Sequence, residues 1–481
     1  MVARVDRVLR EKLGLPDGLA DGRVVVLDPC CGTGAFLVEV LHRIAGTLRE
    51  KGEEALLAHE IKRAAMERVF GFELLTAPFV VAHLQIGALI QQLGGDFAKN
   101  ERAGIYLTNA LTGWEPPSKP KTFLFPEFKE EIDAADHVKR DTRILVILGN
   151  PPYNGFAGIA IGEERRLTTA YRDPIDPRLA RPQGQGLNEL YVRFYRMAER
   201  RIINQTNKGL VCFISNYSWL DGLSHPVMRE RFLSEFDEIT IDCLNGDKYR
   251  TGKVTPEGKP DPSVFSTESN REGIQVGTAI ALLLRSQSHN APATVYFRDL
   301  WGTAKHAELA LEAQTGNTAH HQSIAPKLDL GLIFRPTNTS ADYISWPLLT
   351  ELFPVSFPGI KTSRDSVVVD IDRDRLEARM KMYFDPKVSF DELNKIMPEA
   401  TSTTGGFDAK NIRSYLLGRG YTSEYIWKYL YRPFDVRWLY WEQKAKLLDR
   451  ARTEARVHHT QDNLWLEARQ NSQWKPLIEA M

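Results

Sequence analysis

The sequence predicts an α/β protein in which a Rossmann-like sheet is followed by a mixed α+β domain. Short apolar runs alternate with amphipathic helical stretches through residues 2–284, the pattern of strands joined by helices. A glycine turn directly follows the first apolar run, as in nucleotide-binding sheets. Beyond residue 306 such turns become rare and aromatic side chains frequent. We therefore expect a boundary near residues 286–306, with domains over 1–305 and 306–481.

Composition and charge exclude several classes of protein. The chain has 481 residues and is 43% hydrophobic, which is ordinary for a globular protein of two domains. No apolar run has the length of a membrane span, and the charged amino terminus lacks a signal-peptide core. We therefore expect a cytoplasmic protein without a membrane partner. The 62 basic and 62 acidic side chains balance, so net charge neither requires nor excludes nucleic acid.

No metal site is expected. Three alternating aspartates imitate the start of a calcium loop, but basic residues occupy the positions where such a loop needs its glycine and its final glutamate. These aspartates are Asp370, Asp372 and Asp374, and we expect them in an alternating strand. The four cysteines show no paired ligand spacing, so we interpret them as reduced thiols. They are Cys30, Cys31, Cys212 and Cys243.

The first predicted unit is a helix over residues 2–13, a strand over Val24–Leu27, a turn, and a helix over residues 37–48. The turn has the sequence Asp28-Pro29-Cys30-Cys31-Gly32-Thr33-Gly34-Ala35-Phe36. A dinucleotide-binding turn would have a third glycine where Leu37 stands, and a pyrophosphate would gain little from Asp28. The ammonium and sulfonium of S-adenosylmethionine are cations that a carboxylate attracts. This turn therefore predicts S-adenosylmethionine as the cofactor.

The next two strands supply further candidate cofactor contacts. A strand over residues 69–72 ends in Glu73, which is placed to accept hydrogen bonds from two ribose hydroxyls, although a surface glutamate is the alternative. A helix is expected over residues 77–93. The strand over residues 105–109 ends in Asn109, whose amide could recognise the adenine edge of the cofactor.

The fourth strand delivers the residues that we expect to be catalytic. The apolar run over residues 144–148 and Gly149 precede Asn150-Pro151-Pro152-Tyr153. Two prolines make this turn stiff at the carboxyl end of a buried strand. An exocyclic amine or an amide nitrogen is a poor nucleophile because its lone pair is delocalised. If the Asn150 side-chain oxygen and the Pro151 carbonyl accept hydrogen bonds from it, the lone pair is directed outward, and Tyr153 can stack on the base.

The following stretch completes a mixed sheet of about seven strands. Helices are expected over residues 187–203 and 228–236, and strands over 210–215 and 238–244. Residues 262–265 and 277–284 are typical of a closing hairpin. Within the first of these, Phe265 is a candidate for a second aromatic contact to the base, with a core phenylalanine as the alternative.

The carboxyl-terminal domain combines aromatic residues with arginines, which suits a surface that reads bases, because Arg forks bind guanine edges and phosphates. The alternative for each aromatic residue is a place in the core. The aromatic residues are Trp301, Trp346, Tyr415, Tyr421, Tyr425, Trp427, Tyr429, Tyr431, Trp438, Tyr440 and Trp441, and the basic ones Arg413, Arg419, Arg432, Arg437 and Lys444.

These motifs resemble a known family. The turn at 28–36 with the downstream Asn150-Pro-Pro-Tyr153 is similar to adenine-N6 DNA methyltransferases, with the target-recognition domain after the catalytic domain. The stretches 149–154, 213–222, 236–239 and 431–435 are similar to the methyltransferase and specificity portion of type ISP restriction-modification enzymes. The resemblance implies a Rossmann-like S-adenosylmethionine-dependent methyltransferase that acts on a flipped adenine in double-stranded DNA.

Two features of the family lie outside these motifs. Its members have a cofactor-binding segment with a Thr-Pro motif upstream of the first helix, which we expect to be missing here. Type ISP enzymes also carry a nuclease and a helicase, and we expect neither cleavage nor motor activity from this chain. Two alternatives stay open: a DNA-recognition fragment whose cofactor pocket is incomplete, and a methyltransferase for the glutamine amide of a protein, whose nitrogen poses the same chemical problem.

Overall fold

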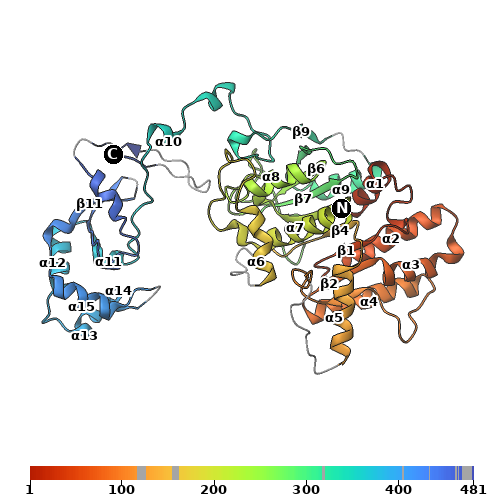
Figure 1. Cartoon of the computed structure of the whole chain (residues 1–481), viewed down its shortest axis with the longest axis horizontal. Helices are drawn as coiled ribbons and strands as arrows, with labels where there is room; N and C mark the ends of the chain where they lie inside the picture. Colours follow the sequence, from red (N-terminus) through yellow and green to blue (C-terminus); the bar gives the residue numbers. More distant parts are fainter. Residues whose placement is uncertain are drawn as a thin grey trace. The chain divides into compact units, whose positions relative to one another are not determined.

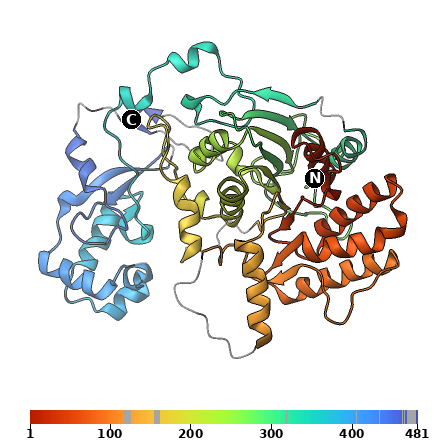
Figure 2. The same ribbon diagram turned by 45° about the vertical axis from the view of Figure 1, so that its right-hand side comes forward.

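The computed structural model describes residues 1–115, 126–153, 162–316, 320–403, 406–432 and 434–460, with residues 463, 465–467 and 479–480. The chain forms two compact units, residues 1–340 and 341–481 (Figures 1 and 2). The division therefore falls at residue 340 rather than near 305, because the first sheet continues beyond the predicted boundary. Among the described residues, no helix is both long and apolar enough to span a membrane.

A nine-stranded mixed sheet forms the centre of the first unit, with the strand order β3-β2-β1-β4-β5-β7-β6-β8-β9. Strands β3, β2, β1, β4 and β5 run parallel, whereas β7 pairs antiparallel with both β5 and β6. The strands are β1 (Val26–Asp28), β2 (Val69–Glu73), β3 (Ile105–Leu107), β4 (Val146–Gly149), β5 (Gly209–Asn216), β6 (Glu238–Asn245), β7 (Thr278–Arg285), β8 (Thr294–Asp299) and β9 (Gln322–Ile324). The predicted α/β class is confirmed.

Helices cover both faces of this sheet. Alternate residues of a strand point to opposite faces, and in β4 Val146 and Leu148 pack in one apolar cluster whereas Ile147 packs in the other. The first cluster includes residues of α1 (Val2–Lys12), α2 (Ala35–Glu50), α3 (Leu57–Glu67) and α4 (Thr76–Gln92), and the second includes residues of α5 (Pro126–Arg140), α7 (Leu190–Arg201) and α8 (Pro226–Glu235). Figure 1 shows α2, α3 and α4 lying together beside β1 and β2.

Two predictions about the end of this sheet need correction. It has nine strands rather than about seven, because β8 and β9 extend it beyond β6. Residues 262–265 are not a strand of a closing hairpin but lie in the connection between β6 and β7. Helix α9 (Lys305–Thr315) and α1 meet, since Arg4 donates to Glu312 at 2.7 Å. The short α6 (Glu163–Leu167) precedes α7.

The second unit has its own core and the predicted α+β character. A three-stranded sheet of order β10-β12-β11 packs with short helices around Leu376, Leu416 and Tyr440. Its elements are α10 (Leu349–Leu352), α11 (Asp365–Val368), β10 (Val369–Asp370), α12 (Arg373–Tyr383), α13 (Phe390–Ile396), α14 (Pro398–Thr401), α15 (Ala409–Arg419), β11 (Ile426–Arg432), β12 (Asp435–Tyr440), β13 (Leu466–Glu467) and β14 (Glu479–Ala480).

We expected the alternating aspartates of this unit to lie in one strand, and this expectation is wrong. Only Asp370 belongs to β10, and α12 begins at Arg373. The side chain of Asp372 accepts hydrogen bonds from the backbone N–H groups of Asp374 and Arg375. Asp372 is therefore the N-cap of α12, a position that favours aspartate because it satisfies free N–H groups of the first turn.

Candidate active site

The pairing of β1 with β4 places the predicted cofactor turn beside the predicted catalytic turn. Val26 pairs with Val146, and Leu27 pairs with Ile147, so both strands end at the same edge of the sheet. A Cβ atom on Gly149 would lie 2.5 Å from Asp28 Oδ1. The approach is possible because position 149 is glycine. Two motifs that are more than a hundred residues apart thus come into contact.

Asp28 is fully buried where β1 ends. Its Oδ1 accepts a hydrogen bond from the backbone N–H of Cys30 at 3.0 Å, while its Oδ2 is buried with no hydrogen-bond partner among the described residues. Burial raises the pKa of Asp28 to about 7 because the charged form is poorly solvated. A cationic ligand beside this carboxyl would stabilise its ionised form, which fits the expected ammonium and sulfonium.

The two glycines of the cofactor turn have backbone conformations, and one has a close contact, that a larger residue would not tolerate. Gly32 and Gly34 have φ angles of +54° and +87°, in the left-handed region that favours glycine. A Cβ atom on Gly34 would lie 3.1 Å from the Cβ of Ala82 in α4. Pro29 is buried, and Phe36 packs against the apolar cluster under the turn. These two residues therefore shape the turn.

Glu73 holds the cofactor turn against the start of α4. Its Oε2 accepts from the backbone N–H of Gly32 at 2.9 Å, and its Oε1 accepts from the N–H groups of Leu74 and Leu75, both at 2.8 Å. A carboxylate offers about four acceptor positions, so most of its capacity is used within the protein. Two ribose hydroxyls would have to replace at least one of these backbone donors.

Asn109 follows β3 and lines a cavity of about 270 Å³ together with Leu74 and Thr108. Both polar atoms of its amide already have partners, because Nδ2 donates to Glu164 Oε1 at 3.0 Å and Oδ1 accepts from the N–H of Leu111 at 2.9 Å. Leu74 was missed by the sequence reasoning. The side chain of Leu74 is 66% exposed and directly follows Glu73. In the sequence, the signal was an apolar residue immediately after the acidic residue that ends a strand.

The catalytic turn carries an unused hydrogen-bond acceptor. Asn150 Oδ1 is buried and has no partner within the described part of the chain. A Cβ atom on the preceding residue, Gly149, would lie 3.3 Å from the sulfur of Cys30. Pro151 is buried and Pro152 is exposed. An unpaired buried oxygen costs free energy, so this position favours a ligand that donates a hydrogen bond. Asn154, the last residue of the motif, lies outside the described residues.

Tyr153 and Phe265 form an aromatic pair at this edge. Their ring centroids are 5.9 Å apart, and the ring planes meet at 72°. The Tyr153 hydroxyl is buried and unpaired among the residues that the structure describes, and burial raises the pKa of Tyr153. The structure therefore brings together the aromatic residue of the catalytic turn and the predicted second aromatic contact.

Two buried aspartates hold the loop that carries Phe265, and the sequence reasoning missed both. Asp261 accepts from the N–H of Gly246 at 2.7 Å and pairs with Lys305 at 2.7 Å. Asp247 accepts from the N–H of Gly277 at 2.9 Å. These bonds tie the connection between β6 and β7 to its own ends and to α9. Nothing local in the sequence distinguishes these aspartates from surface ones.

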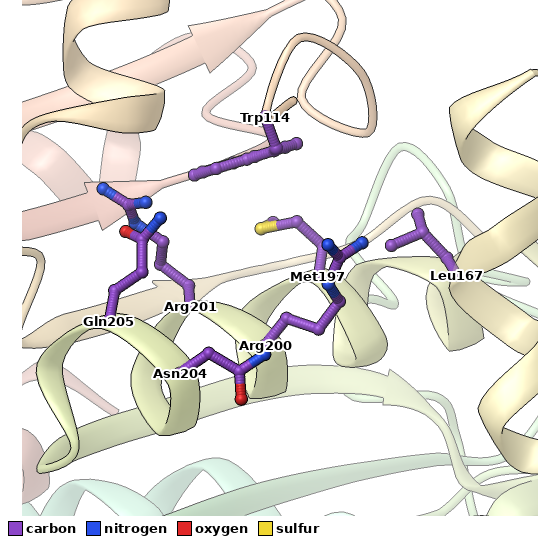
Figure 3. Close-up of a pocket in the computed structure, with 7 residues that line it drawn as sticks. All are labelled: Trp114, Leu167, Met197, Arg200, Arg201, Asn204 and Gln205. Carbon is purple, nitrogen blue, oxygen red and sulfur yellow. The ribbon is translucent and has the colours of Figure 1, made fainter. Parts of the chain in front are cut away.

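A smaller cavity elsewhere in the first unit contains no predicted site residue. It has a volume of about 70 Å³, and Figure 3 shows Trp114 on one side and Met197, Arg200 and Arg201 on the other. The guanidinium carbon of Arg201 lies 5.0 Å from the centroid of the Trp114 ring, and burial lowers the pKa of Arg201 to about 10. This cavity is not part of the candidate site.

The predicted base-reading residues of the second unit separate into two groups. Tyr440 and Trp441 are core residues, Arg413 donates to the backbone carbonyls of Tyr383 and Val388, and Arg419 pairs with Glu442. Tyr440 and Trp441 therefore have the core position that was the alternative for each aromatic residue, and Arg413 and Arg419 stabilise the unit. By contrast, the guanidinium carbons of Arg432 and Arg437 lie 5.4 and 4.1 Å from the centroid of the Tyr431 ring near the end of β11. These three remain candidates for contact with a ligand.

Comparisons with known proteins agree with this architecture. Residues 351–477 match the family model of the Type ISP C-terminal specificity domain. A search of curated proteins found no match. The resemblance to type ISP enzymes inferred from the motifs is confirmed by this domain match and by similar folds among solved structures.

Three of these solved structures cover most of this chain at 21% identity. They are the ATP-dependent Type ISP restriction-modification enzyme LlaBIII bound to DNA (TM-score 0.65, 94% of this chain and 30% of that one), a nuclease-deletion mutant of the Type ISP enzyme LlaGI with a DNA substrate mimic (TM-score 0.65, 94% and 37%), and the DrdV–DNA complex (TM-score 0.60, 92% and 43%). The chain thus spans less than half the length of each.

Proposed function

We propose that this chain is the methyltransferase and DNA-recognition part of a restriction-modification or defence enzyme, and that it transfers a methyl group from S-adenosylmethionine to N6 of a flipped adenine in double-stranded DNA. The observation that carries the proposal is the contact between two turns. Asp28, whose Oδ2 has no hydrogen-bond partner in the described part of the chain, lies beside a turn in which the same is true of Asn150 Oδ1. The proposal concerns the methyltransferase and recognition parts alone, since this chain spans 30% of the length of LlaBIII and 37% of that of the LlaGI mutant.

The residues of the first turn fit the cofactor. S-adenosylmethionine would supply an electrophilic methyl group on a positively charged sulfur. Asp28 would hold the cationic methionine end, Gly32 and Gly34 would let the backbone approach it, and Glu73 would contact the ribose. The cavity beside Leu74 and Asn109 would receive the adenine, with Leu74 covering its apolar face.

Asn150 and Pro151 would activate the target amine. The Asn150 Oδ1 and the Pro151 carbonyl would accept its two N–H groups, which draws the nitrogen toward a tetrahedral shape and directs its lone pair toward the methyl group. The nitrogen–carbon bond would form as the carbon–sulfur bond breaks, the electron pair of that bond would stay on sulfur, and the methylated nitrogen would then release one of its two protons to solvent. Tyr153 and Phe265 would hold the base, because their rings offer apolar contact at the edge where the amine must lie.

The second unit would choose the DNA sequence. Its match to a specificity domain supports this role. Arg432 and Arg437 beside Tyr431 offer guanidinium forks near an aromatic ring, which suits contacts with bases or phosphates.

The test is the Asn150→Ala variant, with Asn100→Ala as control because Asn100 is exposed and outside the site. Tritium transfer from labelled S-adenosylmethionine to unmethylated DNA is measured for each variant, and cofactor binding is measured by calorimetry. We expect Asn150→Ala to reduce transfer by about 100-fold or more with little change in cofactor affinity, and Asn100→Ala to retain it. Undiminished transfer by Asn150→Ala would refute the mechanism.

The same assays separate the two alternatives. Label that enters protein rather than DNA would support a glutamine-amide methyltransferase. Calorimetry that detects no binding of S-adenosylmethionine, together with retained DNA binding, would support a recognition fragment that does not methylate. Sequencing of methylated adenines in DNA from cells that express the chain would identify the recognised sequence.

A further inference from the structure

Arg201, the last residue of α7, is a buried cation beside the cavity of about 70 Å³. Its side chain is 2% exposed. Its Nη2 donates to the backbone carbonyls of Val138 and Thr142, whereas Nε and Nη1 are buried with no hydrogen-bond partner among the described residues. Figure 3 shows the guanidinium below one end of the Trp114 ring, beside Gln205. The side chain therefore has both a charge and N–H donors to offer to a ligand.

Arg201 differs in this respect from other buried arginines of the first unit. Arg4 and Arg298 form ion pairs with Glu312. Arg229 forms no such pair, but all three of its nitrogens donate to backbone carbonyls. Of the buried arginines that the structure describes, Arg201 alone has two nitrogens without a partner.

No acidic side chain of the described first unit compensates this charge by an ion pair, since the partners of Arg201 are the two carbonyls. Asp141 attracts the guanidinium, but the Asp141 side chain is 66% exposed and is bonded to His137 at 3.0 Å. The charge of Arg201 therefore remains without a buried counter-charge.

The remaining stretches of the first unit offer no counter-charge either. Residues 116–125, 154–161 and 317–319 lie outside the described ranges, and their sequences contain no aspartate or glutamate. Glu127 lies at the opposite end of α5 from Val138. A compensating negative charge would therefore have to come from a ligand.

We propose that this cavity is a binding site for a small anion, in which Arg201 supplies the charge. A buried ion without a counter-charge is costly, and an anion would neutralise it while accepting charge-assisted hydrogen bonds. Arg200, Asn204 and Gln205 also line the cavity and carry further N–H donors. A volume of about 70 Å³ suits a halide, a carboxylate of the size of acetate or a phosphate, and it is far too small for a nucleotide. The site does not depend on the proposed methyl transfer.

Trp114 connects this cavity to the segment that follows β3. The guanidinium carbon of Arg201 lies 5.0 Å from the centroid of the Trp114 ring. The indole N–H donates to the carbonyl of Ala110 at 2.6 Å, and the backbone N–H donates to Glu163 Oε1 at 3.1 Å. An anion that fixes Arg201 should therefore stabilise this part of the folded first unit, because a ligand that binds only the folded state raises its stability.

The experiment measures the midpoint temperature of thermal unfolding, Tm, of the full chain. The reference salt is sodium gluconate, whose anion is larger than the cavity, and chloride, acetate or phosphate replaces it at constant ionic strength. Arg201→Met removes the charge but keeps an unbranched side chain under Trp114. Arg49→Met is the control, because Arg49 is exposed on α2. In parallel, crystals of the unmodified chain are soaked in sodium bromide, which is located by its anomalous scattering.

We expect at least one of the three anions to raise Tm in a saturable way at millimolar concentrations, and the anion with the largest effect identifies the class of ion. Arg201→Met should lose this rise and Arg49→Met should keep it. Bromide should lie within hydrogen-bonding reach of Arg201 Nε or Nη1.

Three results would overturn the proposal. An equal rise of Tm in Arg201→Met and the unmodified chain would be a general effect of salt on the protein surface. A cavity that holds water only in the bromide crystals would show that no anion is needed. A bromide peak without a saturable rise of Tm would mark an adventitious ion only. If Arg201→Met does not fold, the bromide crystals and the response of the unmodified chain decide together.

Discussion

At the scale of single residues, the candidate site depends on buried polar atoms that have no partner among the residues the structure describes. Asp28 Oδ2 and Asn150 Oδ1 are both buried and unpaired within the described ranges. Leaving such atoms unpaired costs stability, and binding sites retain them because a ligand supplies the partner. This chain presents one such acceptor from each turn, which suits a cationic donor on one side and an amine on the other.

Asp28→Asn should change the pH dependence of stability. Burial raises the pKa of Asp28 from 3.8 to about 7. The folded state therefore keeps its proton when the unfolded state has lost it, and this contribution to stability is present below about pH 4 and is lost as pH rises to 7. Between pH 5 and 8 the variant should gain on the order of 2 to 3 kcal/mol relative to the unmodified protein. Urea unfolding at pH 5 and at pH 8 measures this difference in the free energy of unfolding.

The control for this change is Asp173→Asn, because the side chain of Asp173 is 76% exposed. Its stability relative to the unmodified protein should be the same at both pH values. If Asp28→Asn behaves in the same way as Asp173→Asn, the Asp28 carboxyl is not held in the protonated form, and the account of its burial is wrong. Asp28→Asn should also weaken binding of S-adenosylmethionine if the proposed cofactor site is correct.

At the scale of elements, the site is made by two strand ends that approach closely. Gly149 at the end of β4 leaves space for Asp28 at the end of β1. Parallel neighbours in a sheet bring their carboxyl ends to one edge, so the two turns of the candidate site meet there.

Gly149→Ala should destabilise the first unit. The added Cβ would lie 2.5 Å from Asp28 Oδ1, so the strand ends would have to separate, at a cost of about 1 to 3 kcal/mol. Thermal and urea unfolding measure this change. Gly87→Ala is the control, since a Cβ there meets nothing within 4 Å in the middle of α4. That variant should gain about 0.5 to 1 kcal/mol. Equal stability of both variants would contradict the close approach.

The N-cap of α12 provides a test in the second unit. Asp372→Ala removes an acceptor for two backbone N–H groups of the first helical turn, which should cost about 1 kcal/mol of free energy of unfolding. Asp372→Asn should retain most of the stability because asparagine caps equally well. Urea unfolding of the second unit measures both variants. A loss in Asp372→Asn as large as in Asp372→Ala would show that the charge, rather than the cap, stabilises the helix.

At the scale of the whole molecule, two separate cores support a division of roles. The apolar clusters of residues 1–340 and the cluster of the second unit have no buried member in common. Units with their own cores can fold independently. We therefore assign cofactor binding and transfer to the first unit, and choice of sequence to the second, as parts of the proposed function.

Exchange of the second unit tests this division. Residues 341–481 are replaced by another Type ISP C-terminal specificity domain of different sequence, and methylated adenines are mapped in DNA from cells expressing each protein. We expect the recognised sequence to change while the affinity for S-adenosylmethionine, measured by calorimetry, stays the same. Methylation of the same sequence by both proteins would contradict a recognition role for the second unit. Loss of cofactor binding would contradict the independence of the first.

Most helices and strands of the first unit follow from local pattern. Apolar runs and helical faces with period 3.6 placed β1 to β6 and the helices α1, α2, α4, α7 and α8 within a few residues, whereas the bounds of α3, α5 and α9 were not predicted. The order of the strands is not local. Strand β7 inserts between β5 and β6, and β8 and β9 extend the sheet, because hydrogen bonds between distant segments decide the pairing.

The sequence by itself determined the residues of the candidate site: a glycine turn after Asp28, a stiff turn that carries Asn150, and the aromatic residues Tyr153 and Phe265. These depend on the conformational freedom of glycine, the rigidity of proline and the charge of a carboxylate, which are properties of single residues. Only the tertiary structure decided that Gly149 lies against Asp28, that Asp247 and Asp261 hold the loop of Phe265, and that Asn109 is already paired. Those roles arise from contacts between residues far apart in the chain, and the same side chains elsewhere would lie on the surface.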